Sequence, residues 1–160
     1  MKYYLVDASA FVYAVENEGN TKIDFLGEKV ENKAFLYIPQ FCIAEVLNTY
    51  ARFFFKDKRI GADTYTKWRG AFLKAVHNRR IFYAYDLHRY HNLNADAIYR
   101  IEHRTVLKPK ETPLSAFDIL IIAMGTELKR IHINDEVVIL TRDARLLRIA
   151  NKFVNAMWFE

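Results

Sequence analysis

The chain has 160 residues, with 52% hydrophobic and 27% charged residues, a balance typical of a folded protein rather than a disordered one. This length predicts a single domain, residues 1–160, that can bury a core without a structural metal or disulfide. One cysteine, short apolar runs and an early charge at Asp7 indicate no disulfide scaffold, membrane span or signal peptide, so we expect a cytoplasmic protein.

The net charge of +5 is unevenly distributed along the chain. Residues 52–110 contain 14 Lys and Arg against 5 Asp and Glu, whereas the flanking residues contain 10 against 14. A basic middle beside acidic flanks is typical of a surface that faces a polyanion next to a site rich in carboxylates. For any single Lys or Arg, a solvated helix face is the simpler explanation.

Strand and helix patterns alternate in the first half of the chain. In chain order, hydrophobic spacing predicts a strand at residues 2–6, a helix at 8–16, a strand at 35–38 and helices at 39–56 and 63–78. Residues 17–33 are polar and predict a loop that can include one turn of helix. Pro39 is expected at the first helical position, which proline favours because its missing N–H costs nothing there.

The alternation continues in the second half. In chain order, the patterns predict a strand at 81–85, a helix at 87–103, a loop at 108–113, a helix at 114–130, a strand at 137–140, a helix at 144–151 and a strand at 153–159. The helix at 114–130 is apolar on nearly every side and should be central. Strands that alternate with helices indicate an α/β protein with a mostly parallel sheet.

Two acidic residues follow predicted strands, at the edge where parallel α/β sheets place their functional sites. Asp7 directly follows the first strand, and Asp143 stands shortly after the fourth. If these strands are neighbours in the sheet, both carboxylates open into one crevice. Two further acids, Glu45 and Asp118, lie on predicted helices that flank such a crevice.

Each of the four acids also has a purely structural explanation. Asp7 and Asp143 stand just before helices, where Asp is a favoured N-cap. Ser115 and Asp118 have the spacing of a capping box, in which the helix dipole also stabilises the acid. Glu45 lies nearly opposite the apolar stripe of its helix, where it can face water.

The combination favours a metal site. Asp118 is embedded in apolar sequence with no Lys or Arg within a helical turn, and burying an unpaired carboxylate is costly. Several carboxylates in one crevice repel one another, and a divalent cation relieves that repulsion. Ligation by oxygen alone selects Mg²⁺ or Mn²⁺ over zinc. Such a site beside a basic surface suits the hydrolysis of a phosphodiester.

At these residues the sequence resembles the PIN domain family of nucleases, and in particular the VapC-type toxins of prokaryotic toxin–antitoxin modules. The matching blocks are LVDASAFVY (5–13), IPQFCIAEVLNTY (38–50), LSAFDILIIAMG (114–125) and VVILTRDARLL (137–147). They stand in the family's order and span the whole chain. The resemblance implies a three-layer α/β/α fold with a five-stranded parallel sheet in the order 3-2-1-4-5, which makes the first and fourth strands neighbours.

The resemblance also implies roles for single residues and for the whole protein. The family's acidic metal-binding quartet is matched by Asp7, Glu45, Asp118 and Asp143, with Mg²⁺ or Mn²⁺ as cofactor, and its hydroxyl positions by Ser9 and Thr141. The implied activity is that of an endoribonuclease toxin that acts on RNA, with a cognate antitoxin and a homodimer. Among the basic residues, we expect contacts with substrate phosphates from Arg52, Lys56, Arg142 and Arg145.

Two positions depart from the family pattern. Gly125 stands where Ala is more usual, which we expect to be harmless for packing. Asp143 is followed by Ala144 and Arg145 rather than by the second acid that many relatives carry. We therefore expect one well-occupied metal site, with a second forming only with substrate.

Two other functions remain open. A PIN-like module could bind RNA or protein without catalysis. A phosphoacceptor receiver domain has a similar architecture and would use Asp86, but Asp7 is followed by Ala8 instead of a second acid. His88 and His91 lack the partners of a zinc site, and we expect a surface or partly buried pair.

Overall fold

The computed structural model of the chain describes residues 1–16, 34–77 and 82–159. Its centre is a five-stranded sheet in the order β3-β2-β1-β4-β5, in which neighbouring strands are parallel. The strands are β1 (Lys2–Val6), β2 (Ala34–Pro39), β3 (Tyr83–Tyr85), β4 (Glu136–Thr141) and β5 (Asn155–Trp158). The expected order and direction of the strands are confirmed. The loop predicted at residues 17–33 lies outside the described residues.

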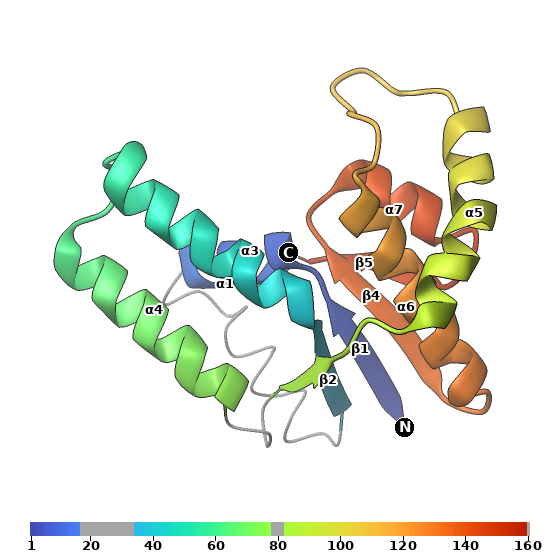
Figure 1. Ribbon diagram of the computed structural model, residues 1–160, viewed down its shortest axis with the longest axis horizontal. Helices are drawn as coiled ribbons and strands as arrows, with labels where there is room; N and C mark the ends of the chain where they lie inside the picture. The colour runs from blue at the N-terminus through green and yellow to red at the C-terminus, as the bar shows by residue number, and fades with distance from the viewer. Residues whose placement is uncertain (17–33, 78–81, 160) are drawn as a thin grey trace.

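Helices cover both faces of the sheet (Figure 1). On one side lie α1 (Ala8–Glu16), α3 (Gln40–Ala51), the short π-helix η1 (Arg52–Lys56) and α4 (Ala62–His77). On the other side lie α5 (Arg89–Arg104), α6 (Ala116–Ile131) and α7 (Ala144–Ala150). This is the expected three-layer α/β/α arrangement.

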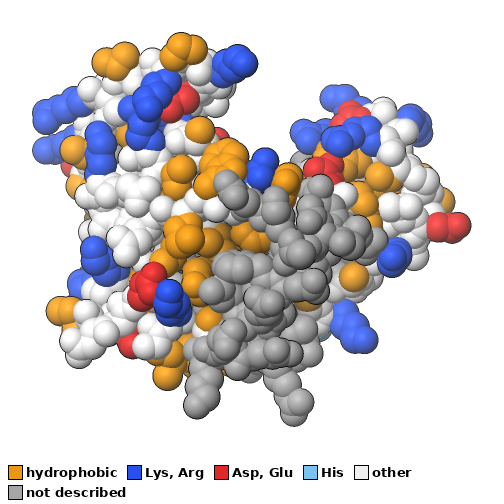
Figure 2. Space-filling model, turned by 180° about the vertical axis from the view of Figure 1, so that it is seen from behind, with side chains coloured by type: hydrophobic (Ala, Val, Ile, Leu, Met, Phe, Trp, Pro, Cys, Tyr) orange, Lys and Arg blue, Asp and Glu red, His pale blue; other side chains and the backbone are white. Residues whose placement is uncertain are grey.

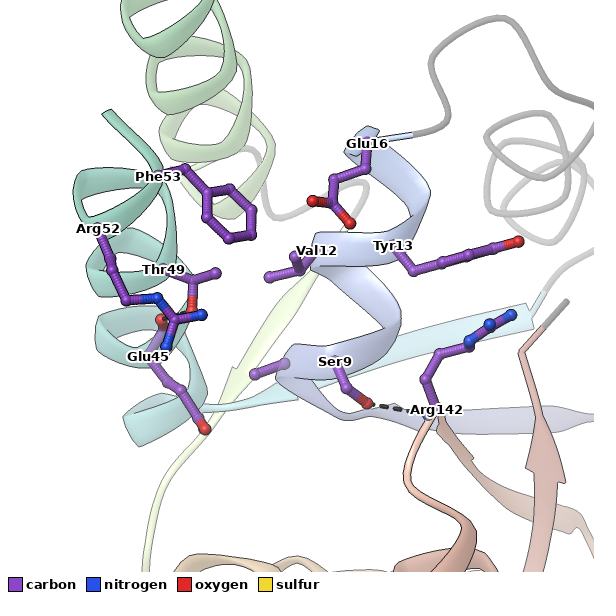
Figure 3. Close-up of a pocket in the computed structure, with 10 residues that line it drawn as sticks. Ser9, Val12, Tyr13, Glu16, Glu45, Thr49, Arg52, Phe53 and Arg142 are labelled. Carbon is purple, nitrogen blue, oxygen red and sulfur yellow. Dashed lines mark hydrogen bonds between the residues drawn. The ribbon is translucent and has the colours of Figure 1, made fainter. Parts of the chain in front are cut away.

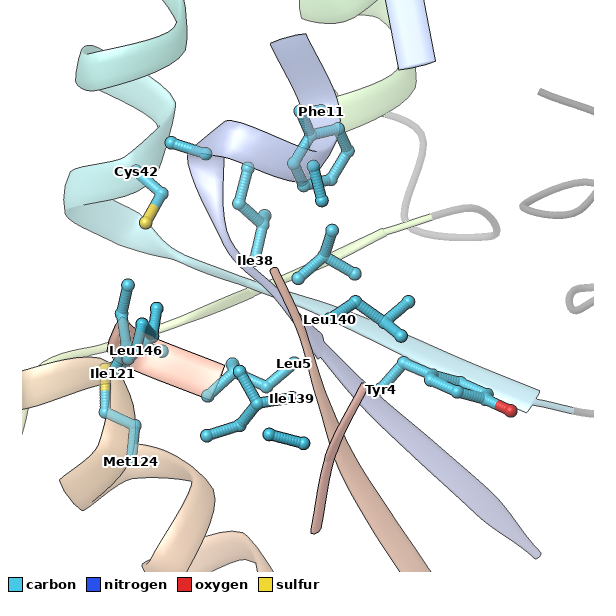
Figure 4. Packing of buried hydrophobic residues seen from close by; sticks show 14 of the residues in the cluster. Tyr4, Leu5, Phe11, Ile38, Cys42, Ile121, Met124, Ile139, Leu140 and Leu146 are labelled. Atoms are coloured by element: carbon cyan, nitrogen blue, oxygen red, sulfur yellow. The ribbon is translucent and has the colours of Figure 1, made fainter. Parts of the chain in front are cut away.

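The alternation of side chains along the strands divides the core into two halves (Figure 4). Leu5 and Ile139 are register partners and face the layer that contains Met124 of α6. Leu140, the next residue of β4, points to the opposite layer, where Phe11 of α1 lies. Strands that are buried on both faces need apolar residues at every position, which explains their continuously hydrophobic sequences.

Several element boundaries differ from the prediction. Pro39 is the last residue of β2 and the N-cap of α3, with φ −54° and ψ 133°, and not the first helical residue. Its ring fixes φ, but ψ stays extended because β2 still pairs with β3 at this position. The last strand is shorter than predicted because the amide of Phe153 donates to Ala150 O and still closes the end of α7.

The helix at 114–130 is central, as predicted. α6 begins two residues later than expected, because Ser115 is its N-cap, and it buries side chains on most of its surface. Among the described residues, no helix combines the length and apolarity that crossing a membrane requires.

The glycine at position 125 fits its place in α6, whereas the alanine that is more usual in the family would be crowded there. A Cβ atom at Gly125 would lie 2.8 Å from Ile139 Cδ1 and 3.0 Å from Ile139 Cγ1. It would also lie 3.3 Å from Val154 Cγ1. The glycine therefore lets α6 approach β4 closely, which brings the helix against the sheet beneath the site.

Gly125→Ala should lower the free energy of unfolding by about 1 kcal/mol, because the cost of overpacking exceeds the gain in helix propensity. Urea denaturation would measure this loss. In an Ile139→Val background, which removes the nearest methyl group, the same substitution should be neutral or stabilising. An equal loss in both backgrounds would contradict the close contact with Ile139.

Candidate functional site

The four predicted acids are placed at the edge where β1 and β4 end. β1 pairs with β4 along its whole length, so the residues that follow these strands are neighbours. Asp7 directly follows β1 and is 5% exposed. Asp143, the N-cap of α7, and Asp118, in the first turn of α6, are half-buried, whereas Glu45 of α3 is exposed.

Two hydroxyl groups hold the Asp7 carboxylate in place. Its Oδ2 atom accepts hydrogen bonds from Ser9 Oγ at 2.5 Å and from Thr141 Oγ1 at 2.8 Å. The same hydroxyls accept from the backbone that leads to α7, because Arg142 N donates to Ser9 Oγ and Asp143 N donates to Thr141 Oγ1. Ser9 and Thr141 therefore fix both the orientation of Asp7 and the backbone at Asp143.

Asp118 and Asp143 also serve as helix caps, as their structural explanation predicts. Asp118 Oδ2 accepts from Ser115 N at 2.8 Å and from Ser115 Oγ at 2.7 Å, which completes a capping box. Asp143 Oδ1 accepts from Leu146 N at 2.7 Å. These hydrogen bonds engage one oxygen of each carboxylate and orient both side chains from rigid helix ends.

The acids influence one another electrostatically. Burial raises the pKa of Asp7 above its ordinary value, and the charge of Asp118 raises it further. Partial burial of its carboxyl group likewise raises the pKa of Glu45, although the residue as a whole is exposed, and the charges of Asp7 and Asp118 contribute. The pKa of Asp118 is raised by burial and then by the charges of Asp143 and Glu102. The four carboxylates thus share one electrostatic environment.

No ion pair within the described part of the chain neutralises any of these four acids. Their donor set consists of carboxylate oxygens and fits a hard dication by its chemistry. As the side chains stand, however, no group of three or more His, Cys, Asp or Glu in the described ranges is arranged to hold an ion. Asp7, Asp118 and Asp143 each use one carboxylate oxygen to accept hydrogen bonds from neighbouring donors.

The prediction that Arg145 contacts substrate phosphate is wrong, because its side chain is 3% exposed. Its Nη2 atom lies 2.8 Å from Glu102 Oε2 and its Nη1 atom 3.3 Å from Glu111 Oε2. The guanidinium also donates to the carbonyl oxygens of Glu102, Thr105 and Val106. Arg145 therefore has a structural task inside the protein.

The sequence analysis missed Glu102, the buried partner of Arg145. Its Oε1 atom accepts from Leu114 N and from Arg145 Nε, both at 3.1 Å, so it connects the segment before α6 to α7. The signal was present in the spacing of α5, whose buried residues are His91, Ala95, Ile98 and Glu102. A carboxylate on the apolar stripe of a helix predicts a buried partner.

The other predicted phosphate contacts lie near the site or on the surface. Arg52 has a half-exposed side chain 3.5 Å from Asp57, and Lys56 is exposed at the end of η1. The Arg142 guanidinium lies 3.6 Å from the centre of the Tyr13 ring and 4.8 Å from that of Trp158. These stacking contacts extend the Arg142 side chain in one direction.

The pair of histidines is structural rather than metal-binding within the described residues. His91 is fully buried, its Nδ1 atom accepts from His88 N at 2.9 Å, and its Nε2 atom is hydrogen-bonded to Glu127. Asp86 is exposed beyond the end of β3, an edge strand that β2 separates from β1. It therefore lies apart from the acid group, contrary to the arrangement of a receiver domain.

Comparisons with known proteins agree with this geometry. The family model described as the PIN domain matches residues 4–152. The chain is similar to VapBC2 from Rickettsia felis, solved with a promoter DNA fragment, with 12% identity, 99% of each chain covered and a TM-score of 0.67. It is also similar to FitAcB from Neisseria gonorrhoeae, with 14% identity, 96% of each chain covered and a TM-score of 0.61. At these identities the similarity shows the fold alone. No curated protein matches the chain.

Asp7→Asn should make the protein more stable in EDTA at pH 7, by about 2–4 °C in melting temperature. The asparagine oxygen can still accept from Ser9 and Thr141, while the desolvated charge and its repulsion with Asp118 are removed. Because the pKa of Asp7 is raised on folding, the wild type should lose stability as pH rises from the ordinary Asp value through the raised one. The variant should lose less, as thermal melts between pH 4 and 8 would show, and the exposed Asp96→Asn is the control.

Arg145→Met should cost about 3–5 kcal/mol of unfolding free energy, because it leaves the Glu102 carboxylate buried without a partner. Urea denaturation would measure the loss. Adding Glu102→Gln, which keeps an acceptor for Leu114 N but removes the charge, should recover part of it. A fully stable Arg145→Met protein would show that the network is dispensable.

Proposed function

Because the chain belongs to the PIN domain family, we propose that it is a single nuclease domain, residues 1–160, that hydrolyses phosphodiester bonds of RNA with Mg²⁺ or Mn²⁺. PIN domains are generally nucleases. The observation that carries the proposal is the group of four acids at one sheet edge, where burial, and then the charges of neighbouring acids, raise the pKa values of Asp7, Glu45 and Asp118. Carboxylates kept together at a sheet edge without partner cations among the described residues are typical of a functional site.

Asp7, Asp118 and Asp143 would hold the ion directly, and Glu45 would bind it through water or position the nucleophile. When bound, Mg²⁺ or Mn²⁺ lowers the pKa of water and offsets the negative charge of the phosphodiester. The protein's own contribution is orientation. Ser9 and Thr141 hold Asp7, while helix capping holds Asp118 and Asp143.

Glu45 is suited to accept a proton during hydrolysis. Its pKa is raised by burial and by the charges of Asp7 and Asp118, so its affinity for a proton is higher than that of an ordinary glutamate. Its side chain is exposed at the same edge and can reach solvent. Its exposure distinguishes Glu45 from Asp7, which is 5% exposed, and supports its role in positioning the nucleophile or binding the ion through water.

The basic surface supports an RNA substrate. In Figure 2, Lys and Arg side chains gather on two lobes at the upper edge of the molecule, with a notch between them. These lobes are the end of the α3–α4 hairpin and the region of the α5–α6 connection. Of the predicted phosphate contacts, Arg52, Lys56 and Arg142 remain in the proposal, and the salt dependence of binding would report them.

We further propose that the protein is the toxin of a toxin–antitoxin module in the cytoplasm, with a cognate antitoxin and a homodimer. The support is the similarity in fold to VapBC2 and to FitAcB, over nearly the whole of each chain. A catalytically silent module that binds RNA or protein is the second candidate. It is favoured by the helix-capping roles of Asp118 and Asp143 and by the lack of a ready ligand group among the described residues.

Mg²⁺ or Mn²⁺ should stabilise the wild-type protein, by about 2.7 kcal/mol when the ion concentration is about 100 times the Kd. Asp118→Asn should lose this stabilisation, whereas the exposed Asp96→Asn should keep it. Thermal melting with and without ion gives the comparison. Equal metal-dependent shifts in wild type and Asp118→Asn would place the ion elsewhere.

Purified wild-type protein should cleave RNA in Mg²⁺ or Mn²⁺, and Asp7→Asn should lower the rate by more than about 100-fold. Both proteins should give the same circular dichroism spectrum, because Asn preserves the hydrogen bonds of Asp7. Cleavage that continues in excess EDTA or in Asp7→Asn would falsify the catalytic assignment. RNA binding without turnover would select the silent module.

A further inference from the structure

One face of α1 and one face of α3 form a groove that leads away from the acidic site (Figure 3). Ser9, Val12 and Glu16 line it from α1, at the spacing of one helix face. Glu45 and Thr49 of α3 line it from the opposite side, and Phe53 of η1 follows them. The groove has a volume of about 380 Å³, within the size range of small-ligand sites.

We propose that this groove binds one unpaired nucleotide of the RNA next to the scissile bond, with the base packed on Val12 at the edge of Phe53 and beside Glu16. The inference rests on the proposed function, because it assigns the nucleotide that flanks the cleaved phosphate. The size of the groove accommodates a single nucleotide and excludes a duplex, so the substrate must be single-stranded there.

The groove is continuous with the acid group at one end. Ser9 lines it and donates to Asp7, and Glu45 lines it while its pKa responds to the charges of Asp7 and Asp118. A nucleotide in the groove therefore has one of its phosphates close to the acids. This continuity is the reason for assigning the groove to the substrate rather than to an unrelated ligand.

Two arginines lie at the margins of the groove, one on the α3 side and one beyond α1. Figure 3 shows Arg52 beside Glu45 and Arg142 beside Tyr13, with α1 between them. Arg142 is held in place by stacking on Tyr13 and by the hydrogen bond from its Nη1 atom to Phe159 O at 3.0 Å. Arg52 is therefore the cation that can approach a phosphate of a nucleotide in the groove, whereas Arg142 can meet the strand where it continues past α1.

The far end of the groove suits a base. Val12 and the edge of the Phe53 ring give this end an apolar wall, although Phe53 itself is only 4% exposed. Arg59 fixes this end, because its Cζ atom lies 4.1 Å from the centre of the Phe53 ring and its Nη2 atom 3.0 Å from Glu16 Oε1. The Glu16 carboxylate can only accept hydrogen bonds, so it favours a base edge that donates them. Guanine, with two adjacent N–H donors, fits best.

The test measures binding of 2′-O-methyl trinucleotides UGU, UAU, UCU and UUU to the full chain in EDTA, by fluorescence anisotropy. UGU should bind most tightly, and Glu16→Gln should remove most of an about 10-fold preference. Thr49→Glu should weaken binding of UGU much more than Asn48→Glu. Asn48 is exposed on the same helix and lies outside the groove lining, so the two variants carry the same added charge.

The possible outcomes distinguish a failure of the groove proposal from a failure of the nuclease proposal. If the protein cleaves RNA but Thr49→Glu and Asn48→Glu bind UGU equally well, the groove proposal is wrong and the nuclease proposal stands. If UGU binding depends on Thr49 but the protein cleaves no RNA, the groove proposal is supported and the nuclease proposal is wrong. Binding of an arginine-rich peptide that depends on Thr49, with no trinucleotide binding, makes the groove a peptide site and overturns the proposal.

Discussion

The pairing of β1 with β4 is the constraint on which the candidate site depends. It brings the ends of two strands from opposite ends of the sequence into register, and Asp7 N continues the ladder by donating to Leu140 O at 2.9 Å. The hydroxyls of Ser9 and Thr141 then join the two strand ends through the Asp7 carboxylate. Since α7 starts directly after this junction, the position of Asp143 follows from it.

Near the joined ends of β1 and β4, arginine side chains pair with some carboxylates and not with others. Arg145 and Arg148 neutralise Glu102 and Glu111 below the site, and their hydrogen bonds lower the pKa of Glu111 to about 2. The acids at the strand ends have no such partner among the described residues. The protein thus builds buried ion pairs close to the four acids but leaves these acids without them. This arrangement lowers stability locally, as is typical of functional sites.

More of the fold than of the candidate site could be predicted from the sequence. Continuous apolar strands between amphipathic helices indicated a parallel α/β sheet, and the family resemblance supplied the strand order. The burial of Arg145 could not be predicted, because a helix as short as α7 has too few residues to define a buried face and its partners come from α5 and the following loop. The space at Gly125 was equally hidden, since it depends on the position of one methyl group of Ile139.

Sequence alone also could not decide between capping and ligation for Asp118 and Asp143. The hydrogen-bonded oxygen of each satisfies its helix, so in the proposed site ligation would use the other oxygen of the same carboxylate. Position in a motif identifies the residue, whereas only coordinates identify the atom that a ligand can reach. Glu102 shows the complementary case, in which regular spacing alone marked a charged residue as internal.

The connection between α5 and α6 looks dispensable from its side chains, since Val106 is 83% exposed. Its carbonyl oxygen nevertheless accepts from both Arg145 and Arg148, and Leu114 further along is tied to Glu102. Apart from Glu111 and Ser115, whose side chains pair with arginines or cap α6, this segment acts through its backbone. Its length therefore matters more than most of its side chains, because an insertion or deletion would displace the starts of α6 and α7 relative to each other.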